Sequence, residues 1–209
     1  YEAGVLTGKK PGYGGSLGRK EATGYGLVYF VEEMLREAKQ SFINQKVVVS
    51  GSGNVAIYAI EKAQHFGAKV VACSDSSGYI YDPEGIDLKI VKELKEVQGK
   101  RIKEYVTHRP NATYTEGCDG IWTIPCDIAL PCATQNEING EQARTLIANG
   151  VKVVAEGANM PSNLDAINEF LASDVLFGPG KAANAGGVAV SALEMAQNSG
   201  RNYWSEQEV

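Results

Sequence analysis

A glycine-rich motif between two predicted strands is the part of the sequence best suited to bind a ligand. Gly51-Ser52-Gly53-Asn54-Val55-Ala56 fits the pattern G-x-G-x-x-G/A, with alanine in the third small position. In this pattern the first glycine permits a tight turn, the second lets the backbone approach a diphosphate, and the third small residue lets a helix pack closely on a strand. The diphosphate meets free N–H groups at the positive end of the helix dipole. The motif predicts a dinucleotide site, and the alternative is a glycine-rich turn that serves packing alone.

An acidic residue, Asp75, follows the second predicted strand, 22 residues after Gly53. An acid at this place in a dinucleotide-binding unit hydrogen-bonds the hydroxyl groups of the adenosine ribose. Because a carboxylate repels a 2′-phosphate, Asp75 favours NAD, whereas the neighbouring hydroxyl of Ser76 is compatible with NADP. Three basic residues further along the chain could supply positive charge, or could form a solvated face: Lys100, Arg101 and Lys103. The residue types leave the cofactor open, and Asp75 could instead cap a turn.

The motif lies inside a predicted strand–turn–helix–strand unit. A β-branched run at residues 46–50 is typical of a buried parallel strand. A helical pattern follows at 55–66, and Gly67 stands where a C-terminal cap is expected. A second strand is predicted at 69–74. Strand, helix and strand within about thirty residues make one βαβ unit, which is the context that a dinucleotide motif requires.

The rest of the pattern predicts a doubly wound α/β fold. Residues 1–18 predict an entry loop, and residues 19–39 predict a leading helix in which Gly24 and Gly26 suggest close approach of another helix or of a ligand. Further strands are predicted at 79–81, 127–130, 152–155 and 175–177, and further helices at 86–106 (one or two), 142–148, 164–171 and 187–198. We therefore predict a mostly parallel, Rossmann-like NAD(P)-binding sheet, with residues 1–209 as one dinucleotide-binding domain.

Composition excludes several classes of protein and partner. The 209 residues are 44% hydrophobic and 22% charged, which is typical of a globular domain. A net charge of -5 argues against nucleic acid or an anionic membrane as partner, and no apolar run approaches the length of a bilayer span. The four cysteines form no C-x-x-C pair, so we expect reduced thiols, no metal site and a cytoplasmic location. Because the chain starts at Tyr1 without an initiator Met, we interpret it as part of a longer protein.

Five longer strings give the sequence a resemblance to a known family. They are residues 14–26 (GGSLGRKEATGYG), 50–56 (SGSGNVA), 130–136 (LPCATQN), 156–161 (EGANMP) and 179–188 (PGKAANAGGV). On these strings, the chain resembles the cofactor-binding second domain of the hexameric bacterial glutamate dehydrogenases over nearly all of its length. Leucine and phenylalanine dehydrogenases share the layout, but we expect them to differ across most of these strings.

The resemblance implies roles for particular residues. It implies that residues 133–135 lie along the adenosine half of the cofactor, and that Asn159 and Asn184 lie near its nicotinamide end. On the substrate side, it implies that Ser191 contacts the side-chain carboxylate of glutamate and that Arg19 lies near the substrate pocket. The complete predicted set of cofactor-binding residues joins the motif to the matched positions: Thr23, Gly51, Ser52, Gly53, Asn54, Val55, Asp75, Ser76, Ala133, Thr134, Gln135, Asn159 and Asn184.

The resemblance also implies a reaction and an assembly. The expected reaction is the reversible oxidative deamination of L-glutamate to 2-oxoglutarate and ammonium, with hydride transfer to NAD(P)+, and the family resemblance favours NADP. The family's catalytic lysine and aspartate belong to its first domain, upstream of Tyr1, so we expect no catalytic residue and no turnover in this chain alone. The whole protein is expected to be a homo-hexamer. Lys20 departs from the family, where many relatives carry proline, and should alter the start of the helix.

Three other functions fit parts of the pattern. One is another amino-acid dehydrogenase, and a second is a module that senses nucleotides without catalysis. The third is an S-adenosylmethionine-dependent methyltransferase, whose sheet also carries a glycine-rich turn between strand and helix. The dinucleotide strings and the asparagine-rich loops fit the methyltransferase poorly.

Overall fold

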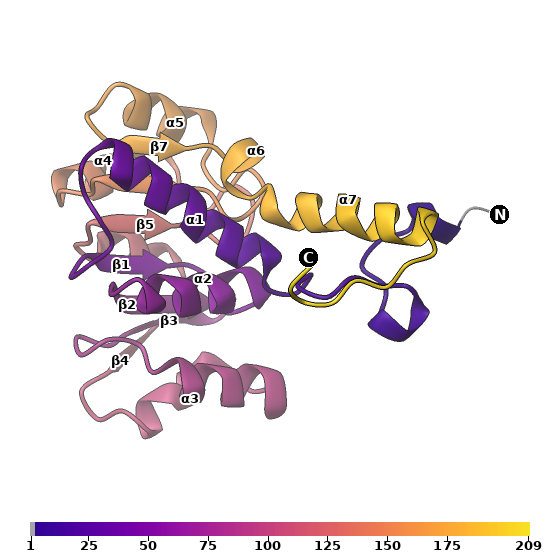
Figure 1. The fold of residues 1–209 in the computed structure, drawn as a ribbon. Helices are drawn as coiled ribbons and strands as arrows, with labels where there is room; N and C mark the ends of the chain where they lie inside the picture. Colours follow the sequence, from indigo (N-terminus) through magenta and orange to yellow (C-terminus); the bar gives the residue numbers. More distant parts are fainter. Residues whose placement is uncertain (1–2) are drawn as a thin grey trace.

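The sheet has seven strands, and its parallel part is built around β1 (Figure 1). The computed structural model describes residues 3–209, and the spatial order is β4-β3-β2-β1-β5-β6-β7. The strands are β1 Lys46–Val49, β2 Lys69–Asp75, β3 Gly78–Tyr81, β4 Thr113–Glu116, β5 Ile128–Leu130, β6 Val153–Ala155 and β7 Leu176–Gly178. Strands β2, β1, β5, β6 and β7 pair in parallel, and β3 and β4 add an antiparallel edge. The mostly parallel α/β fold is the predicted one.

Helices connect the parallel strands and cover the sheet (Figure 1). They are α1 Ala22–Glu37, α2 Asn54–His65, α3 Leu88–Lys92, α4 Gly140–Ala148, α5 Leu164–Leu171, α6 Gly180–Ala183 and α7 Gly186–Ser199. Within residues 3–209, no helix is both long enough and apolar enough to cross a membrane. The chain order of the strands reverses beside β1, because β2 lies on one side and β5 on the other. Open α/β sheets bind ligands at the carboxyl ends of the strands at such a reversal.

The core has one cluster on each face of the sheet. Val47 and Val49 of β1 pack into the cluster that α1 and α2 complete, whereas Val48 packs into the cluster that α4 and α5 complete. Successive strand residues point to opposite faces, so a strand that is buried on both faces must be apolar throughout. This is why the run of β-branched residues at 46–50 predicted β1.

Glycines let α1 pack closely against both α2 and α7. A Cβ on Gly24 would stand 2.6 Å from the carbonyl oxygen of Val55 in α2. A Cβ on Gly26 would stand 3.0 Å from the Cα of Gly186, at the start of α7. The predicted close approach at Gly24 and Gly26 is confirmed, and its partners are helices. From this crossing, α7 extends away from the sheet, beside the first described residues of the chain (Figure 1).

Several predicted boundaries differ from the structure. The leading helix covers Ala22–Glu37 rather than 19–39, because residues 19–21 form a turn before it. The predicted entry loop, 1–18, contains short 3-10 helices at Ala3–Val5 and Pro11–Tyr13, and its first two residues lie outside the described part of the chain.

For residues 86–106, where one or two helices were predicted, the structure has two separate helical segments. α3 continues into a π-helical turn at Glu93–Val97. Gly99, with φ +63°, ends this first segment, and a 3-10 helix follows at Ile102–Thr107. A left-handed glycine ends a helix because the next residues leave the helical path. β4 was not predicted, since its residues are mostly exposed and polar and show no alternation.

Candidate functional site

The turn after β1 requires glycine at its first position. Gly51 has φ +87°, a conformation that other residues adopt at a cost. A Cβ there would stand 3.1 Å from the carbonyl oxygen of Cys132 and 3.2 Å from the Cα of Ala133. The Gly51 N–H donates a 2.7 Å hydrogen bond to the Ser74 hydroxyl at the end of β2. The protein itself therefore explains the first glycine of the motif.

The second glycine has no such explanation within the protein. Gly53 is the N-cap of α2, with φ -86° and ψ -171°, and a Cβ added there would meet nothing within 4 Å. Among residues 3–209, neither the N–H of Ser52 nor that of Gly53 donates to a protein acceptor, and no side chain caps the helix. The positive end of α2 thus faces open space, which fits an anionic group that approaches the backbone.

A cavity of about 610 Å³ adjoins this turn at the carboxyl ends of β1, β2 and β5. We call it the β2 cavity. It brings together seven of the predicted cofactor-binding residues: Gly51, Ser52, Gly53, Asp75, Ser76, Ala133 and Thr134. It also contains Arg101, one of the three basic residues noted in the sequence. Its other lining residues were not predicted to bind the cofactor: Ser74, Lys95, Cys118, Asp119, Ile121, Trp122, Cys132, Asn136 and Glu137.

The carboxylate of Asp75 organises the loops around the β2 cavity. One oxygen accepts a 2.8 Å hydrogen bond from the Ser77 N–H, and the other accepts a 3.0 Å bond from the Ile102 N–H. The side chain is buried. The turn-capping role is therefore present in the structure, and contact with a ribose stays a prediction.

Two cationic side chains from the segment between β3 and β4 line the β2 cavity. The guanidinium of Arg101 donates a 2.5 Å hydrogen bond to the Ser76 hydroxyl, and Lys95 lines the same cavity. Lys103, by contrast, points to Glu116 at 3.5 Å and does not line the cavity. Of the three basic residues singled out in the sequence, Arg101 alone lines the cavity.

Glu137 forms part of the opposite wall. Its carboxylate accepts hydrogen bonds from the N–H groups of Ala133, at 3.1 Å, and Thr134, at 3.3 Å. Burial raises the pKa of Glu137, and this outweighs the hydrogen bonds from Ser50, Ala133 and Thr134, which lower it. The Ala133 and Thr134 N–H groups are thus already occupied by the protein, unlike those of Ser52 and Gly53.

Two cysteines on the wall of the β2 cavity are thiols. Burial raises the pKa of Cys132 well above its ordinary value. Burial also raises the pKa of Cys118, and the charge of Asp75 adds to the effect. Since the thiolate is the reactive form, neither side chain is activated as a nucleophile.

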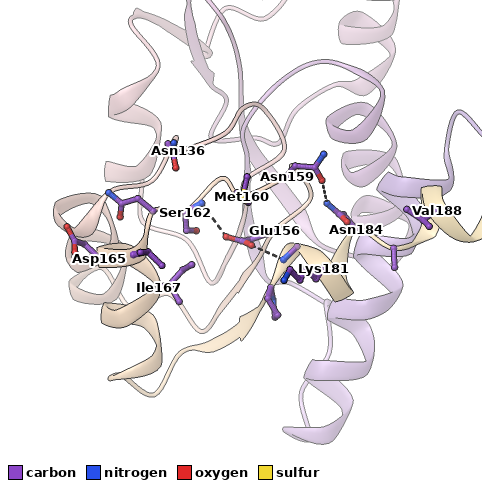
Figure 2. Close-up of a pocket in the computed structure, with 15 residues that line it drawn as sticks. Asn136, Glu156, Asn159, Met160, Ser162, Asp165, Ile167, Lys181, Asn184 and Val188 are labelled. Atoms are coloured by element: carbon purple, nitrogen blue, oxygen red, sulfur yellow. Dashed lines mark hydrogen bonds between the residues drawn. The ribbon is translucent and has the colours of Figure 1, made fainter.

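A second cavity, of about 860 Å³, lies between the ends of β6 and β7 and the start of α7 (Figure 2). We call it the β6 cavity. Asn159 and Asn184 both line it and point toward each other, with a 2.9 Å bond from the Asn184 Nδ2 to the Asn159 Oδ1 (Figure 2). Asn136 lines this cavity and the β2 cavity alike. The two cavities therefore adjoin along the carboxyl edge of the parallel strands.

Arg19, Thr23 and Ser191 gather where α1 meets α7. A Cβ on Gly187 would stand 2.3 Å from the Thr23 hydroxyl and 3.1 Å from a terminal nitrogen of Arg19. The Ser191 hydroxyl donates a 3.0 Å bond to the Gly187 carbonyl. The Arg19 Nε is buried without a hydrogen-bond partner in the described part of the chain. Such a donor can serve an anionic group that the chain itself does not supply.

Four of the predicted cofactor-binding residues line neither cavity: Thr23, Asn54, Val55 and Gln135. Asn54 and Val55 form the first turn of α2 beside the open end of the helix, and Gln135 is exposed on the loop after β5. Within residues 3–209, no three His, Cys, Asp or Glu side chains are grouped as a metal site would require. The arrangement suits an extended anionic ligand that crosses the ends of the strands.

Comparisons with known proteins point to one family. Residues 14–209 match the family model described as Glutamate/Leucine/Phenylalanine/Valine dehydrogenase. The NADP-specific glutamate dehydrogenase of Helicobacter pylori is 56% identical over 212 aligned positions, which cover 99% of this chain and 47% of that protein. The NAD(P)-specific glutamate dehydrogenase of Xylanibacter ruminicola is 56% identical, with 99% of this chain and 47% of that protein covered.

Solved structures agree in fold. The glutamate dehydrogenase of Plasmodium falciparum superposes with a TM-score of 0.91 at 49% identity, covering 97% of this chain and 44% of that chain. The chain thus spans about half the length of the curated relatives that it matches.

Proposed function

Given that the chain belongs to the Glutamate/Leucine/Phenylalanine/Valine dehydrogenase family, we propose that residues 1–209 form the dinucleotide-binding domain of a glutamate dehydrogenase. The proposed reaction of the whole protein is the reversible oxidative deamination of L-glutamate to 2-oxoglutarate and ammonium. The observation that carries the proposal is the turn after β1, where Gly53 and the N–H groups beside it face open space at the positive end of α2.

The two cavities suggest how the dinucleotide binds. Its diphosphate takes the N–H groups of Ser52 and Gly53, and its adenosine half enters the β2 cavity. Its nicotinamide half enters the β6 cavity, where Asn159 and Asn184 offer amide groups. Support comes from Asn136, because a ligand that passes this residue reaches both cavities.

We propose NADP as the preferred cofactor. Arg101 and Ser76 lie side by side in the β2 cavity and together offer a guanidinium and a hydroxyl to a 2′-phosphate, with Lys95 as a further cation. Asp75 is already engaged by two backbone N–H groups, which reduces its repulsion of a phosphate. The relatives named above as NADP-specific and NAD(P)-specific fit this preference.

The substrate side is proposed to lie where α1 meets α7. Support comes from Ser191 and from Arg19, whose buried Nε has no hydrogen-bond partner among residues 3–209 and so could donate to the side-chain carboxylate of glutamate. When bound, the nicotinamide ring supplies the acceptor for the substrate hydride. This chain's part is to hold that ring and one side of the substrate in place. The catalytic lysine and aspartate are proposed to lie in the remainder of the protein, which is proposed to be a cytoplasmic homo-hexamer.

Titration calorimetry tests the proposal directly. The protein should bind NADP+ more tightly than NAD+, and S-adenosylmethionine should not compete. Absence of binding by either dinucleotide at millimolar concentration would overturn the proposal. Competition by S-adenosylmethionine would favour a methyltransferase instead. For the intact protein, reduction of NADP+ should depend on glutamate, and dependence on leucine or phenylalanine would point to another amino-acid dehydrogenase.

A further inference from the structure

Glu156 is a buried carboxylate at the floor of the β6 cavity, directly after β6 (Figure 2). Only 4% of its surface is exposed. One oxygen accepts a 3.2 Å hydrogen bond from the Ser162 N–H, and the other accepts a 2.7 Å bond from the Gly180 N–H. Its hydrogen bonds in the described part of the chain come from backbone donors, and no lysine or arginine forms an ion pair with it there. Burying a carboxylate without a paired cation costs free energy of folding, which hydrogen bonds offset only in part.

The two donors belong to the segments that carry the facing asparagines. Ser162 lies just beyond the loop that contains Asn159, and Gly180 is the first residue of α6, which Asn184 follows. The amide of Asn184 also donates to the carbonyl of Ala158 at 3.2 Å, besides its bond to Asn159. The Glu156 carboxylate and the asparagine pair thus make two separate connections between the same two segments.

The glycine at position 180 fits this connection. A Cβ there would stand 3.1 Å from the Ala158 carbonyl oxygen and 3.3 Å from a Glu156 carboxylate oxygen. The backbone of α6 therefore approaches both the carboxylate and the loop so closely that a larger residue would push them apart. The distance between Asn159 and Asn184 depends on this approach.

We propose that Glu156 is a positioning residue for the nicotinamide half of the cofactor. By holding the Ser162 and Gly180 N–H groups, it fixes the relative position of Asn159 and Asn184, and it does not need to touch the cofactor itself. The inference rests on the proposed function, because it assigns the β6 cavity to the nicotinamide half. It adds a residue whose effect should be confined to one half of the dinucleotide.

The test compares a whole dinucleotide with a probe that lacks the nicotinamide half. Affinities of the intact protein for NADP+ and for adenosine 2′,5′-bisphosphate are measured with Glu156→Gln, which keeps the size but replaces one acceptor by a donor. NADP+ should bind about tenfold more weakly, the loss expected when one hydrogen bond to a charged group is removed. Binding of the bisphosphate should not change. The matched control is Glu169→Gln, a partly exposed carboxylate on α5 that bonds Arg144, and it should change neither affinity.

A double-mutant cycle shows whether Glu156 acts through the asparagines. In a protein that already carries Asn159→Ala and Asn184→Ala, Glu156→Gln should have no further effect on NADP+ affinity. If Glu156→Gln unfolds the protein, Glu156→Asp replaces it, since the shorter carboxylate can reach only one of the two N–H groups.

Three outcomes would overturn the inference. Equal losses for NADP+ and the bisphosphate would show a general structural role, and an unchanged NADP+ affinity would show no role. Additive effects in the cycle would show that Glu156 acts independently of the asparagines. The proposed function fails separately, if the wild-type protein binds neither ligand. The three outcomes above concern a wild-type protein that does bind NADP+, so the two failures can be told apart.

Discussion

Two groups of glycines in this chain differ in what occupies the space beside them. At the crossing of α1 with α2 and α7, protein backbone fills the space at Gly24 and Gly26. At Gly53 that space is open, and the adjoining N–H groups have no protein acceptor among residues 3–209. A glycine motif alone does not distinguish these cases. The occupied space indicates packing, and the open space indicates a ligand.

Two carboxylates differ in whether the protein offsets the effect of burial on their pKa. Burial raises the pKa of Asp82, but hydrogen bonds from Arg109 and Tyr105 outweigh it and hold the pKa below its usual range. Burial raises the pKa of Glu137, in the β2 cavity, and the hydrogen bonds there do not compensate. The protein thus stabilises the charged form of Asp82, whereas it does not do so for Glu137 in the cavity wall.

The largest expected effect is on the packed glycine. Gly24→Ala places a Cβ against the backbone of α2, which cannot move without shifting the helix. We expect a loss of about 3 kcal/mol in the free energy of unfolding, despite the better helix propensity of alanine. Urea denaturation measures it. Gly12→Ala is the control, because a Cβ there meets nothing within 4 Å, and equal stability of the two variants would contradict the account.

The open glycine should behave in the opposite way. Gly53→Ala should leave the free energy of unfolding within about 0.5 kcal/mol of wild type, since the Cβ meets nothing in the protein. NADP+ affinity should fall about a hundredfold, because the methyl group displaces the diphosphate from two N–H donors. Calorimetry and urea denaturation on the same protein separate these effects. Unchanged NADP+ affinity would show that no ligand approaches Gly53.

A smaller effect should separate the two cofactors. Arg101→Ala removes the guanidinium beside Ser76, so NADP+ should bind about tenfold more weakly while NAD+ binding is unchanged. Lys103→Ala is the matched control, because Lys103 points to Glu116 outside the cavity. Equal weakening of NADP+ and NAD+ by Arg101→Ala would place the 2′-oxygen elsewhere.

The smallest expected effect depends on pH. The raised pKa of Glu137 means that its charged form is disfavoured in the folded protein, so its contribution to stability is lost as pH rises through the folded pKa. Glu137→Gln should therefore match wild type at pH values below the ordinary glutamate pKa. Near neutral pH it should be more stable than wild type, because glutamine carries no charge that burial disfavours. Thermal unfolding across this pH range measures the difference. A variant that becomes less stable than wild type as pH rises would show that the folded protein lowers the pKa of Glu137 instead.

Local patterns predicted much of the fold. The β-branched run of β1, the motif and the cap at Gly67 predicted the first βαβ unit, because each signal is contained in a few neighbouring residues. The Lys/Glu-rich amphipathic pattern of residues 86–106 predicted one or two helices but did not show where they divide, which the structure places at Gly99. The edge strand β4 depends on pairing with β3 and has no pattern of its own.

Apart from the residues that the family resemblance supplied, the site was predictable only where one segment forms it. The turn containing Gly51 and Gly53 is encoded locally, and so is Asp75 at the end of its strand. Glu137, Lys95 and the other unpredicted residues of the β2 cavity come from separate segments that only the folded chain brings together. Distinguishing Arg101 from its basic neighbours likewise required knowing which side of the segment faces the cavity.

The most direct test is a crystal structure of the protein with NADP+. The account predicts that oxygens of the diphosphate accept hydrogen bonds from the Ser52 and Gly53 N–H groups at the start of α2. A diphosphate bound elsewhere, with these N–H groups left in contact with water, would contradict it.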